Sequence, residues 1–373
     1  MKGFSVRTEI EEYATFQEYA EQANLGAEDL VLCGSHTYEK YIAPLSLNVQ
    51  TLFREKYGKG EPTDEMVDAI LEELRKRNFN RIIAIGGGTV IDIAKAVAAA
   101  GKQDKVDDLY DKVENLQKVH PLVIIPTTCG TGSEVTNISV INRISKGVKM
   151  GLASDAMYAD QAVLIADMLD SLPYKIFATS SIDAMVHSVE SFLSPNACST
   201  SRLFSKEALK IILKCWKKSV ETGEGDAWKK YSAEFLKASN WAGIGFGYGG
   251  CAAVHACAYP LGSVYHIPHG QSNQLMFQAV MQKYREIRSD GRMNELETII
   301  AETLNTEQSR ALSTLYELMD KVLKKEPLRN FGVKETDLLV FAADVIKTQQ
   351  RLLKNNYTEL SEAQILEIYK NAY

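Results

Sequence analysis

The sequence predicts an α/β domain over residues 1–172, followed by an all-helical domain over residues 173–373. Short apolar runs that end in turn residues recur before residue 170, whereas helical periodicity dominates after Leu172-Pro173. The chain of 373 residues is also long enough for two domains. No repeat or low-complexity segment separates the halves, so a tight hinge is predicted near Pro173.

Four runs in the first half are typical of buried parallel strands. They are filled by β-branched and other apolar residues, and Gly34, Gly86 and Thr127 follow three of them as turn residues. The runs cover residues 29–33, 81–85, 122–126 and 161–165. We expect them to pair in one doubly wound sheet. In the second half, apolar residues at helical spacing predict helices over residues 204–220, 228–243 and 338–353.

Composition and charge are those of a soluble globular protein. Hydrophobic residues make up 45% and charged residues 24% of the chain, which predicts no disorder. The formal charge is −6 without any Lys/Arg-rich tract, so no nucleic-acid partner is expected. No apolar run is long enough to span a membrane, and the first residues lack the hydrophobic stretch of a signal peptide. A cytoplasmic protein with reduced cysteines and no membrane partner is therefore predicted.

A glycine-rich loop, residues 86–89, lies where the second run meets a predicted helix. Glycines let backbone N–H groups approach a pyrophosphate, and the helix adds its positive amino end. The common G-x-G-x-x-G pattern is absent, because Ile91 holds its third glycine position. The loop predicts a dinucleotide site, and a ligand-free turn that eases the chain into a helix is the alternative.

A second polar loop, residues 127–137, follows the third run directly. Its hydroxyl groups and two glycines suit contacts with phosphate and ribose. Without a ligand, the same residues would form a Ser/Thr-rich turn that caps a helix.

Two segments of the second half, residues 181–187 and 255–270, contain four of the six histidines and predict a metal site. Asp183 and His187 are four residues apart, so on a helix they project from one face. His255 and His269 complete a set of one carboxylate and three imidazoles. Such a set suits Fe(II), Zn or Mn and leaves a position for a substrate oxygen. Hydrogen-bonded histidines without a metal are the alternative.

The order and spacing of these motifs resemble those of the iron-dependent (group III) alcohol dehydrogenase family over nearly the whole chain. This resemblance implies a dehydroquinate synthase-like fold, in which an α/β dinucleotide-binding domain precedes an all-helical domain. Residues 55–62, 194–197, 253–256, 265–270 and 349–357 are most similar to family members that oxidise 4-hydroxybutyrate.

The resemblance also implies an activity and its cofactors. We expect hydride transfer between a nicotinamide and a primary alcohol/aldehyde pair, with 4-hydroxybutyrate and succinate semialdehyde as the leading pair. Fe(II) is the expected metal, with Zn as the alternative. The expected partners are a small-molecule substrate and a second copy of the chain in a dimer.

Single residues take their roles from the same resemblance. The metal-ligand positions are Asp183, His187, His255 and His269. The positions that hold the dinucleotide are Gly34, Gly86, Gly87, Gly88, Thr89, Asp92, Thr127, Thr128, Thr131 and Lys149. Members that prefer NAD often place an acidic residue at the end of the first strand. Here the segment reads Cys33-Gly34-Ser35-His36, so NAD is expected and NADP stays open.

Three further residues are candidates for catalysis or substrate binding. Tyr259 stands where many members carry a second histidine, and its phenol would relay protons or form a pocket wall. Arg351 and His266 are candidates for binding a substrate carboxylate, and arginine offers the stronger, bidentate interaction. An ordinary ion pair is the alternative for Arg351.

Three other functions are alternatives to this one. An iron-dependent dehydrogenase for butanol, 1,3-propanediol or lactaldehyde would share all of these motifs. A zinc enzyme similar to dehydroquinate synthase or glycerol dehydrogenase shares the broad architecture, but the loop at 127–137 together with His255 and His269 argues against it. A non-catalytic binding protein on the same fold is the remaining alternative.

Overall fold

The computed structural model describes residues 3–373, which form two compact units. One unit is Ser5–Leu172, and the other comprises residues 3–4 together with Pro173–Tyr373. The predicted start of the first domain, residue 1, lies outside the described residues. Residues 3–4 differ from the prediction by joining the helical unit, because the ring of Phe4 packs on Phe204 and Tyr248 at centroid distances of 5.8 and 4.6 Å.

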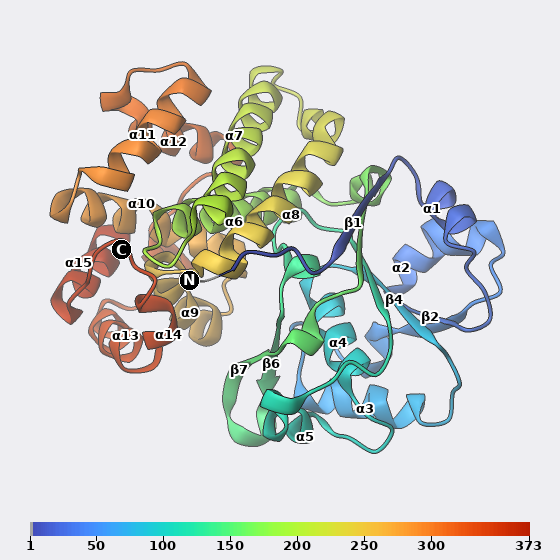
Figure 1. The fold of residues 1–373 in the computed structure, drawn as a ribbon. Helices are drawn as coiled ribbons and strands as arrows, with labels where there is room; N and C mark the ends of the chain where they lie inside the picture. Colours follow the sequence, from blue (N-terminus) through green and yellow to red (C-terminus); the bar gives the residue numbers. More distant parts are fainter. Residues whose placement is uncertain (1–2) are drawn as a thin grey trace. The chain divides into compact units, whose positions relative to one another are not determined.

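The α/β unit is built on a six-stranded parallel sheet (Figure 1). Its order is β1 (Glu9–Tyr13), β8 (Gln161–Ile165), β5 (Leu122–Pro126), β4 (Arg81–Gly86), β2 (Asp29–Cys33) and β3 (Gln50–Phe53). The four predicted strands are confirmed. The two edge strands, β1 and β3, were not predicted, because neither is a continuous apolar run and only one residue of the two is fully buried.

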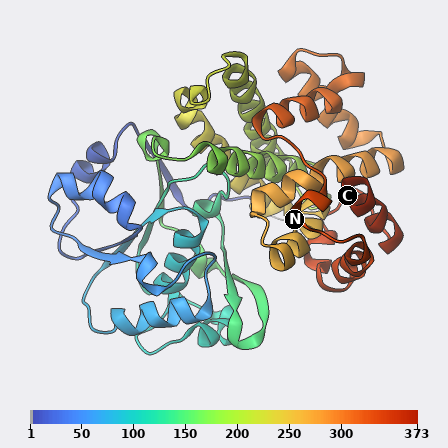
Figure 2. The same ribbon diagram turned by 180° about the vertical axis from the view of Figure 1, so that it is seen from behind.

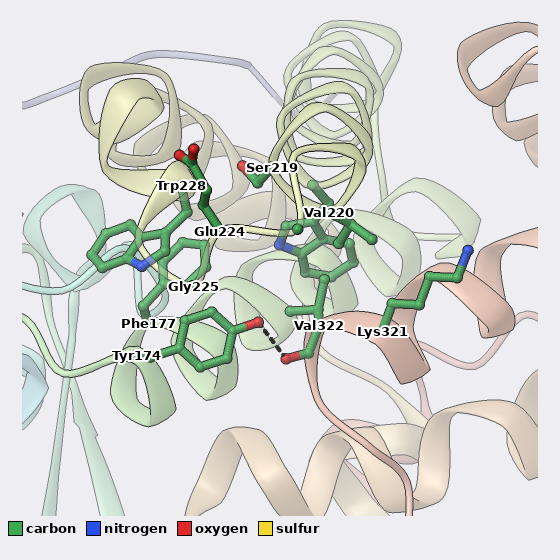
Figure 3. Close-up of a pocket in the computed structure, with 11 residues that line it drawn as sticks. Tyr174, Phe177, Ser219, Val220, Glu224, Gly225, Trp228, Lys321 and Val322 are labelled. Carbon is green, nitrogen blue, oxygen red and sulfur yellow. Dashed lines mark hydrogen bonds between the residues drawn. The ribbon is translucent and has the colours of Figure 1, made fainter.

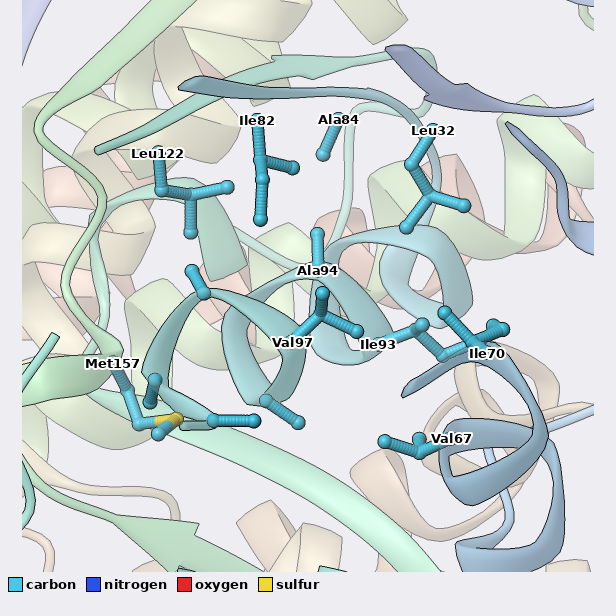
Figure 4. Close-up of a cluster of buried hydrophobic side chains, with 14 of the residues drawn as sticks. Leu32, Val67, Ile70, Ile82, Ala84, Ile93, Ala94, Val97, Leu122 and Met157 are labelled. Carbon is cyan, nitrogen blue, oxygen red and sulfur yellow. The ribbon is translucent and has the colours of Figure 1, made fainter. Parts of the chain in front are cut away.

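Helices cover both faces of this sheet. Helices α3 (Asp64–Leu74), α4 (Gly88–Ala99) and α5 (Val106–Asp111) cover one face, and α1 (Phe16–Gln22) packs on the other. The short helix α2 (Ser35–Thr37) follows β2. Side chains alternate along each strand, so Leu32 and Ala84 pack toward α3 and α4 (Figure 4), while Val31 and Ile83 pack toward α1. Burial on both faces explains why the central strands read as unbroken apolar runs.

An antiparallel hairpin of β6 (Ile138–Arg143) and β7 (Val148–Ala153) forms a second, separate sheet. The sequence does not predict this hairpin. Its second strand is largely exposed, so the strand lacks the apolar pattern that marks the central ones.

The second unit is helical (Figures 1 and 2). Its helices are α6 (Tyr174–Leu193), α7 (Ser199–Glu221), α8 (Ser232–Gly249), α9 (Ala253–Tyr265), α10 (His269–Ile287), α11 (Gly291–Leu304), α12 (Ala311–Val322), α13 (Glu335–Thr348), α14 (Gln350–Leu353) and α15 (Glu362–Ala372). The predicted stretch 204–220 lies in α7, most of 228–243 lies in α8, and 338–353 is divided between α13 and α14 at Gln349. The predicted fold class is confirmed. Among the described residues, no helix is long and apolar enough to cross a membrane.

Candidate functional site

Helix α6 supplies two of the four predicted metal ligands. It begins after Pro173 and is buried on nearly all sides from Phe177 onward. Asp183 and His187 are one helical turn apart and are 4% and 5% exposed, so both point into the protein interior. A buried carboxylate beside a buried imidazole requires a compensating partner.

Helices α9 and α10 bring the other two candidates to the same place. His255 lies in the first turn of α9, and His269 is the first residue of α10. The start of α10 packs closely on α6, since a Cβ atom on Gly270 would lie 2.1 Å from the backbone oxygen of Thr179. Only glycine permits this approach, which carries the neighbouring His269 toward α6.

The imidazoles of His187, His255 and His269 all approach the carboxylate of Asp183, and the ligand atoms of Asp183, His255 and His269 lie within 4.8 Å of one another. The Nε2 atoms of His187, His255 and His269 lie 3.8, 3.5 and 3.6 Å from Oδ1 of Asp183. Four ligands at about 2.0–2.2 Å from a tetrahedral ion lie about 3.4 Å from one another. The donor set and its spacing therefore fit a divalent metal.

Asn273, one turn after His269 on α10, reaches into the same cluster. Its Nδ2 atom donates to Asp183 Oδ1 at 2.8 Å and lies 3.2 Å from His255 Nε2. The amide thus contacts acceptor atoms that would also attract a cation. Its Oδ1 atom is buried and has no hydrogen-bond partner among residues 3–373.

The electrostatics of the cluster favour an ionised carboxylate. Burial alone would raise the pKa of Asp183, but the neighbouring His187, His269 and His255 outweigh it and lower this pKa. Burial opposes protonation of His187, and the charge of Asp183 raises its pKa nonetheless. The site thus stabilises a negative oxygen among nitrogen ligands, as a cation would require.

Glu190, which the sequence analysis missed, holds His255 in place. Its buried carboxylate accepts hydrogen bonds from the backbone N–H of Ala252 at 2.9 Å and of Val254 at 2.6 Å. Oε2 also lies 2.6 Å from Nδ1 of His255, which therefore carries the proton. This bond leaves the Nε2 lone pair facing Asp183, an arrangement typical of metal-binding histidines. Glu190 is three residues after His187 on α6, so its helical spacing was a usable signal.

We predict that Glu190→Gln weakens metal binding by about 10- to 100-fold. The carboxylate of Glu190 accepts from three donors, whereas a glutamine side chain has one acceptor oxygen and an N–H₂ group that only donates. His255 Nδ1 would then face a donor, and the proton would move to Nε2. Metal affinity by competition with a chelator measures the effect. Glu297→Gln, at a nearly buried glutamate of α11 that pairs with Arg285, is the matched control. Equal metal affinity in both variants would contradict the role of Glu190.

Cys251 also lies beside the cluster and was not singled out from the sequence. A nitrogen atom of His187, a nitrogen atom of His255 and the Cys251 sulfur lie within 4.8 Å of one another. Burial would raise the pKa of this thiol, but the charges of His255 and His187 lower it to about 7. No spacing rule predicted it, because Cys251 precedes α9 on an irregular segment.

The three candidates for catalysis or substrate binding lie in this helical unit. Tyr259 is half-buried one turn after His255, and its ring centroid is 6.2 Å from that of His269. His266 is exposed and ends α9 in a left-handed conformation, with φ 54°. Arg351 is exposed on α14, and Asn355 Nδ2 donates both to its carbonyl oxygen and to that of Cys251. Tyr259 is thus beside the metal candidates, and α14 is tied to the start of α9.

The two polar loops of the α/β unit lie against each other. The backbone N–H of Thr127 donates to the carbonyl of Gly86 at 3.1 Å. A Cβ atom on Gly87 would lie 3.2 Å from the methyl group of Thr128, and one on Gly88 would lie 3.2 Å from that of Thr131. At the start of α4 the glycines thus let the two loops pack closely, and this cradle of backbone at a helix amino end suits the predicted pyrophosphate site.

The remaining dinucleotide candidates lie around this cradle. Thr89 donates to the carbonyl oxygen of Gly60, and the ammonium group of exposed Lys149 pairs with neighbouring Glu61 at 2.8 Å. Gly34 follows β2, next to β4 in the sheet. Both carboxylate oxygens of Asp92, a predicted dinucleotide residue, accept hydrogen bonds from the protein, from Ser133 and Val140. These hydrogen bonds tie α4 to the second loop and to β6.

A separate pocket of about 180 Å³ lies in the helical unit (Figure 3). It is lined by α6, α7, the 3₁₀ helix Ala227–Tyr231 and the end of α12, and it includes none of the metal candidates. Two of its polar groups bond within the fold, since Tyr174 donates to the carbonyl of Val322 and Trp216 donates to Ser181.

Comparisons with known proteins place the chain in a family. Residues 7–166 match the family described as iron-containing alcohol dehydrogenase, and residues 177–373 match the C-terminal part of the Fe-containing alcohol dehydrogenase family. The chain is 40% identical to a 4-hydroxybutyrate dehydrogenase of Clostridium kluyveri over 100% of both chains. It is 33% identical to long-chain-alcohol dehydrogenase 1 of Geobacillus thermodenitrificans, over 84% of this chain and 80% of the relative.

Solved structures show the same fold. A crystal structure of 1,3-propanediol oxidoreductase superposes with a TM-score of 0.87 at 22% identity, over 100% of both chains. Both halves of the chain match family models, and a full-length relative exceeds 30% identity. The chain therefore belongs to the iron-containing alcohol dehydrogenase family.

Proposed function

We propose that this alcohol dehydrogenase converts 4-hydroxybutyrate and NAD into succinate semialdehyde, NADH and a proton, and catalyses the reverse reaction. The observation that carries the catalytic part is the convergence of three imidazole nitrogens on Oδ1 of Asp183. The substrate rests on 40% identity to a 4-hydroxybutyrate dehydrogenase along the full chain.

Asp183, His187, His255 and His269 would hold the metal. Fe(II) is our first choice and Zn the second, because one carboxylate and three imidazoles suit both ions. When bound, such an ion supplies Lewis-acid chemistry to the oxygen of the alcohol or aldehyde. Glu190 keeps the proton on Nδ1 of His255, and so keeps the Nε2 lone pair available.

The loops at 86–89 and 127–131 would hold the dinucleotide, because backbone N–H groups at the amino end of α4 can donate to phosphate oxygens. NAD supplies the hydride acceptor, while the protein provides orientation. The hydroxyl groups of Thr127, Thr128 and Thr131 are assigned to ribose and phosphate, and Lys149 contributes a cation near Thr89.

Tyr259 and Arg351 are assigned to the substrate. The Tyr259 phenol, beside His269, would take up and return the proton of the alcohol. Arg351 would bind the carboxylate with its guanidinium group, and His266 is the second candidate. Arg351 is exposed on α14, and an ordinary ion pair stays the alternative for it.

Turnover of matched aldehydes tests the proposed function. Enzyme reconstituted with Fe(II) is assayed by nicotinamide absorbance with succinate semialdehyde and with butyraldehyde, which lacks only the carboxylate. We expect the higher kcat/KM for succinate semialdehyde. A preference for butyraldehyde would redirect the assignment to a short alcohol or diol such as butanol, 1,3-propanediol or lactaldehyde. No turnover with any of them would favour a binding protein.

A further inference from the structure

Three strand ends meet beside the glycine-rich loop. In the sheet, β2 lies between β4 and β3, and Cys33 is in register with both Ile85 and Phe53. Glu55 follows Phe53, and Gly87 follows Ile85, by two residues each. Neighbouring strands are about 4.8 Å apart, so these ends lie within about 10 Å of one another across the sheet edge.

Glu55 extends from the end of β3 to the end of β2. It lies in the 3₁₀ helix Arg54–Tyr57, and its Oε1 atom accepts a hydrogen bond from the backbone N–H of Ser35 at 3.1 Å. A Cβ atom on Gly34 would lie 2.9 Å from the same oxygen. The absence of a side chain at Gly34 therefore makes room for a carboxylate from the neighbouring strand. The carboxylate of Glu55 thus lies at the end of β2, although no acidic residue follows this strand directly in the sequence.

The two cationic residues that flank Glu55 in the sequence, Arg54 and Lys56, contact other groups. Arg54 donates to the carbonyl of Gly58 at 3.0 Å, and the Lys56 ammonium lies 5.9 Å from the centroid of the Phe53 ring. The Ser35 N–H, which a phosphate oxygen would need, already bonds to Glu55. The local groups thus favour a neutral hydroxyl over a phosphate dianion.

We propose that Glu55 makes the enzyme select NAD over NADP. An acidic group one strand away from a phosphate-binding glycine loop accepts hydrogen bonds from the ribose 2′-hydroxyl. The same charge repels the 2′-phosphate of NADP, which is itself anionic. This inference rests on the proposed function, in which residues 86–89 hold the pyrophosphate.

The test is fluorescence titration of NADH and NADPH with the full-length enzyme and its Glu55→Gln variant. Glutamine keeps the size and the oxygen that accepts from Ser35 but removes the charge. We expect the wild type to bind NADH more tightly than NADPH, and the ratio of the two affinities to fall by about tenfold or more in Glu55→Gln. Glu55→Asp, which retains the charge, should keep most of the preference.

Glu28→Gln is the matched control. Glu28 is an exposed residue at the opposite, amino end of β2, where it accepts a hydrogen bond from Asn80, and its loss removes the same charge from the same unit. We expect its affinity ratio to equal that of the wild type. An equal fall in Glu28→Gln and Glu55→Gln would overturn the proposal, as would an unchanged ratio in Glu55→Gln that still binds NADH. If the unsubstituted enzyme binds neither nucleotide, the proposed function itself fails, and this result is seen before any variant is compared.

Discussion

His269→Ala should lose its bound metal and lower kcat by about a thousandfold or more, because Lewis-acid stabilisation contributes several kcal/mol. The His269 side chain is 40% exposed, whereas those of His187 and His255 are 7% and 3% exposed. Truncation at His269 therefore leaves no sealed cavity, and the fold should survive. Dinucleotide affinity should change little, because the candidate dinucleotide residues belong to the other compact unit.

Elemental analysis of the purified variant measures the metal, and NADH fluorescence measures the dinucleotide site. His120→Gln is the control for loss of an imidazole elsewhere, since His120 lies in the α/β unit and packs on Phe79. It should retain full metal content. A His269→Ala enzyme with full metal content and wild-type turnover would remove His269 from the ligand set.

The parts of the fold that could be predicted from sequence are those that are buried on both faces. Strands β2, β4, β5 and β8 have unbroken apolar runs because helices or other packing cover both sides of them. The edge strand β1, Glu9–Tyr13, has no such run, and the exposed strand β7 includes Lys149 and Met150. Exposure removes the signal, so these strands become visible only in the structure.

The candidate site, too, could be predicted only in part. The helical spacing of Asp183 and His187 predicted a shared face, but the approach of His255 and His269 depends on packing between helices that spacing cannot give. Glu190 carried a readable helical signal, whereas Cys251 carried none. The contact between Glu55 and Ser35 joins the ends of the neighbouring strands β3 and β2, so only the strand register shows it.

Arg351→Met should lower kcat/KM for succinate semialdehyde while leaving that for butyraldehyde nearly unchanged. If the guanidinium binds the substrate carboxylate, its removal leaves a charge without a partner. Such a loss costs about 2–5 kcal/mol when the pair is desolvated, which corresponds to about 30- to 5,000-fold in rate. Methionine keeps much of the apolar stem, so the pocket shape should change little.

Lys354→Met controls for the loss of one positive charge in the same segment. Lys354 follows α14 directly, three residues after Arg351, so the variant changes the net charge equally. We expect it to keep the preference for succinate semialdehyde. Equal losses on both aldehydes in Arg351→Met would indicate general damage to the pocket. No loss of kcat/KM for either aldehyde would move carboxylate recognition to His266, an exposed residue three positions before His269. His266→Phe, assayed with the same two aldehydes, would then separate recognition of charge from recognition of shape.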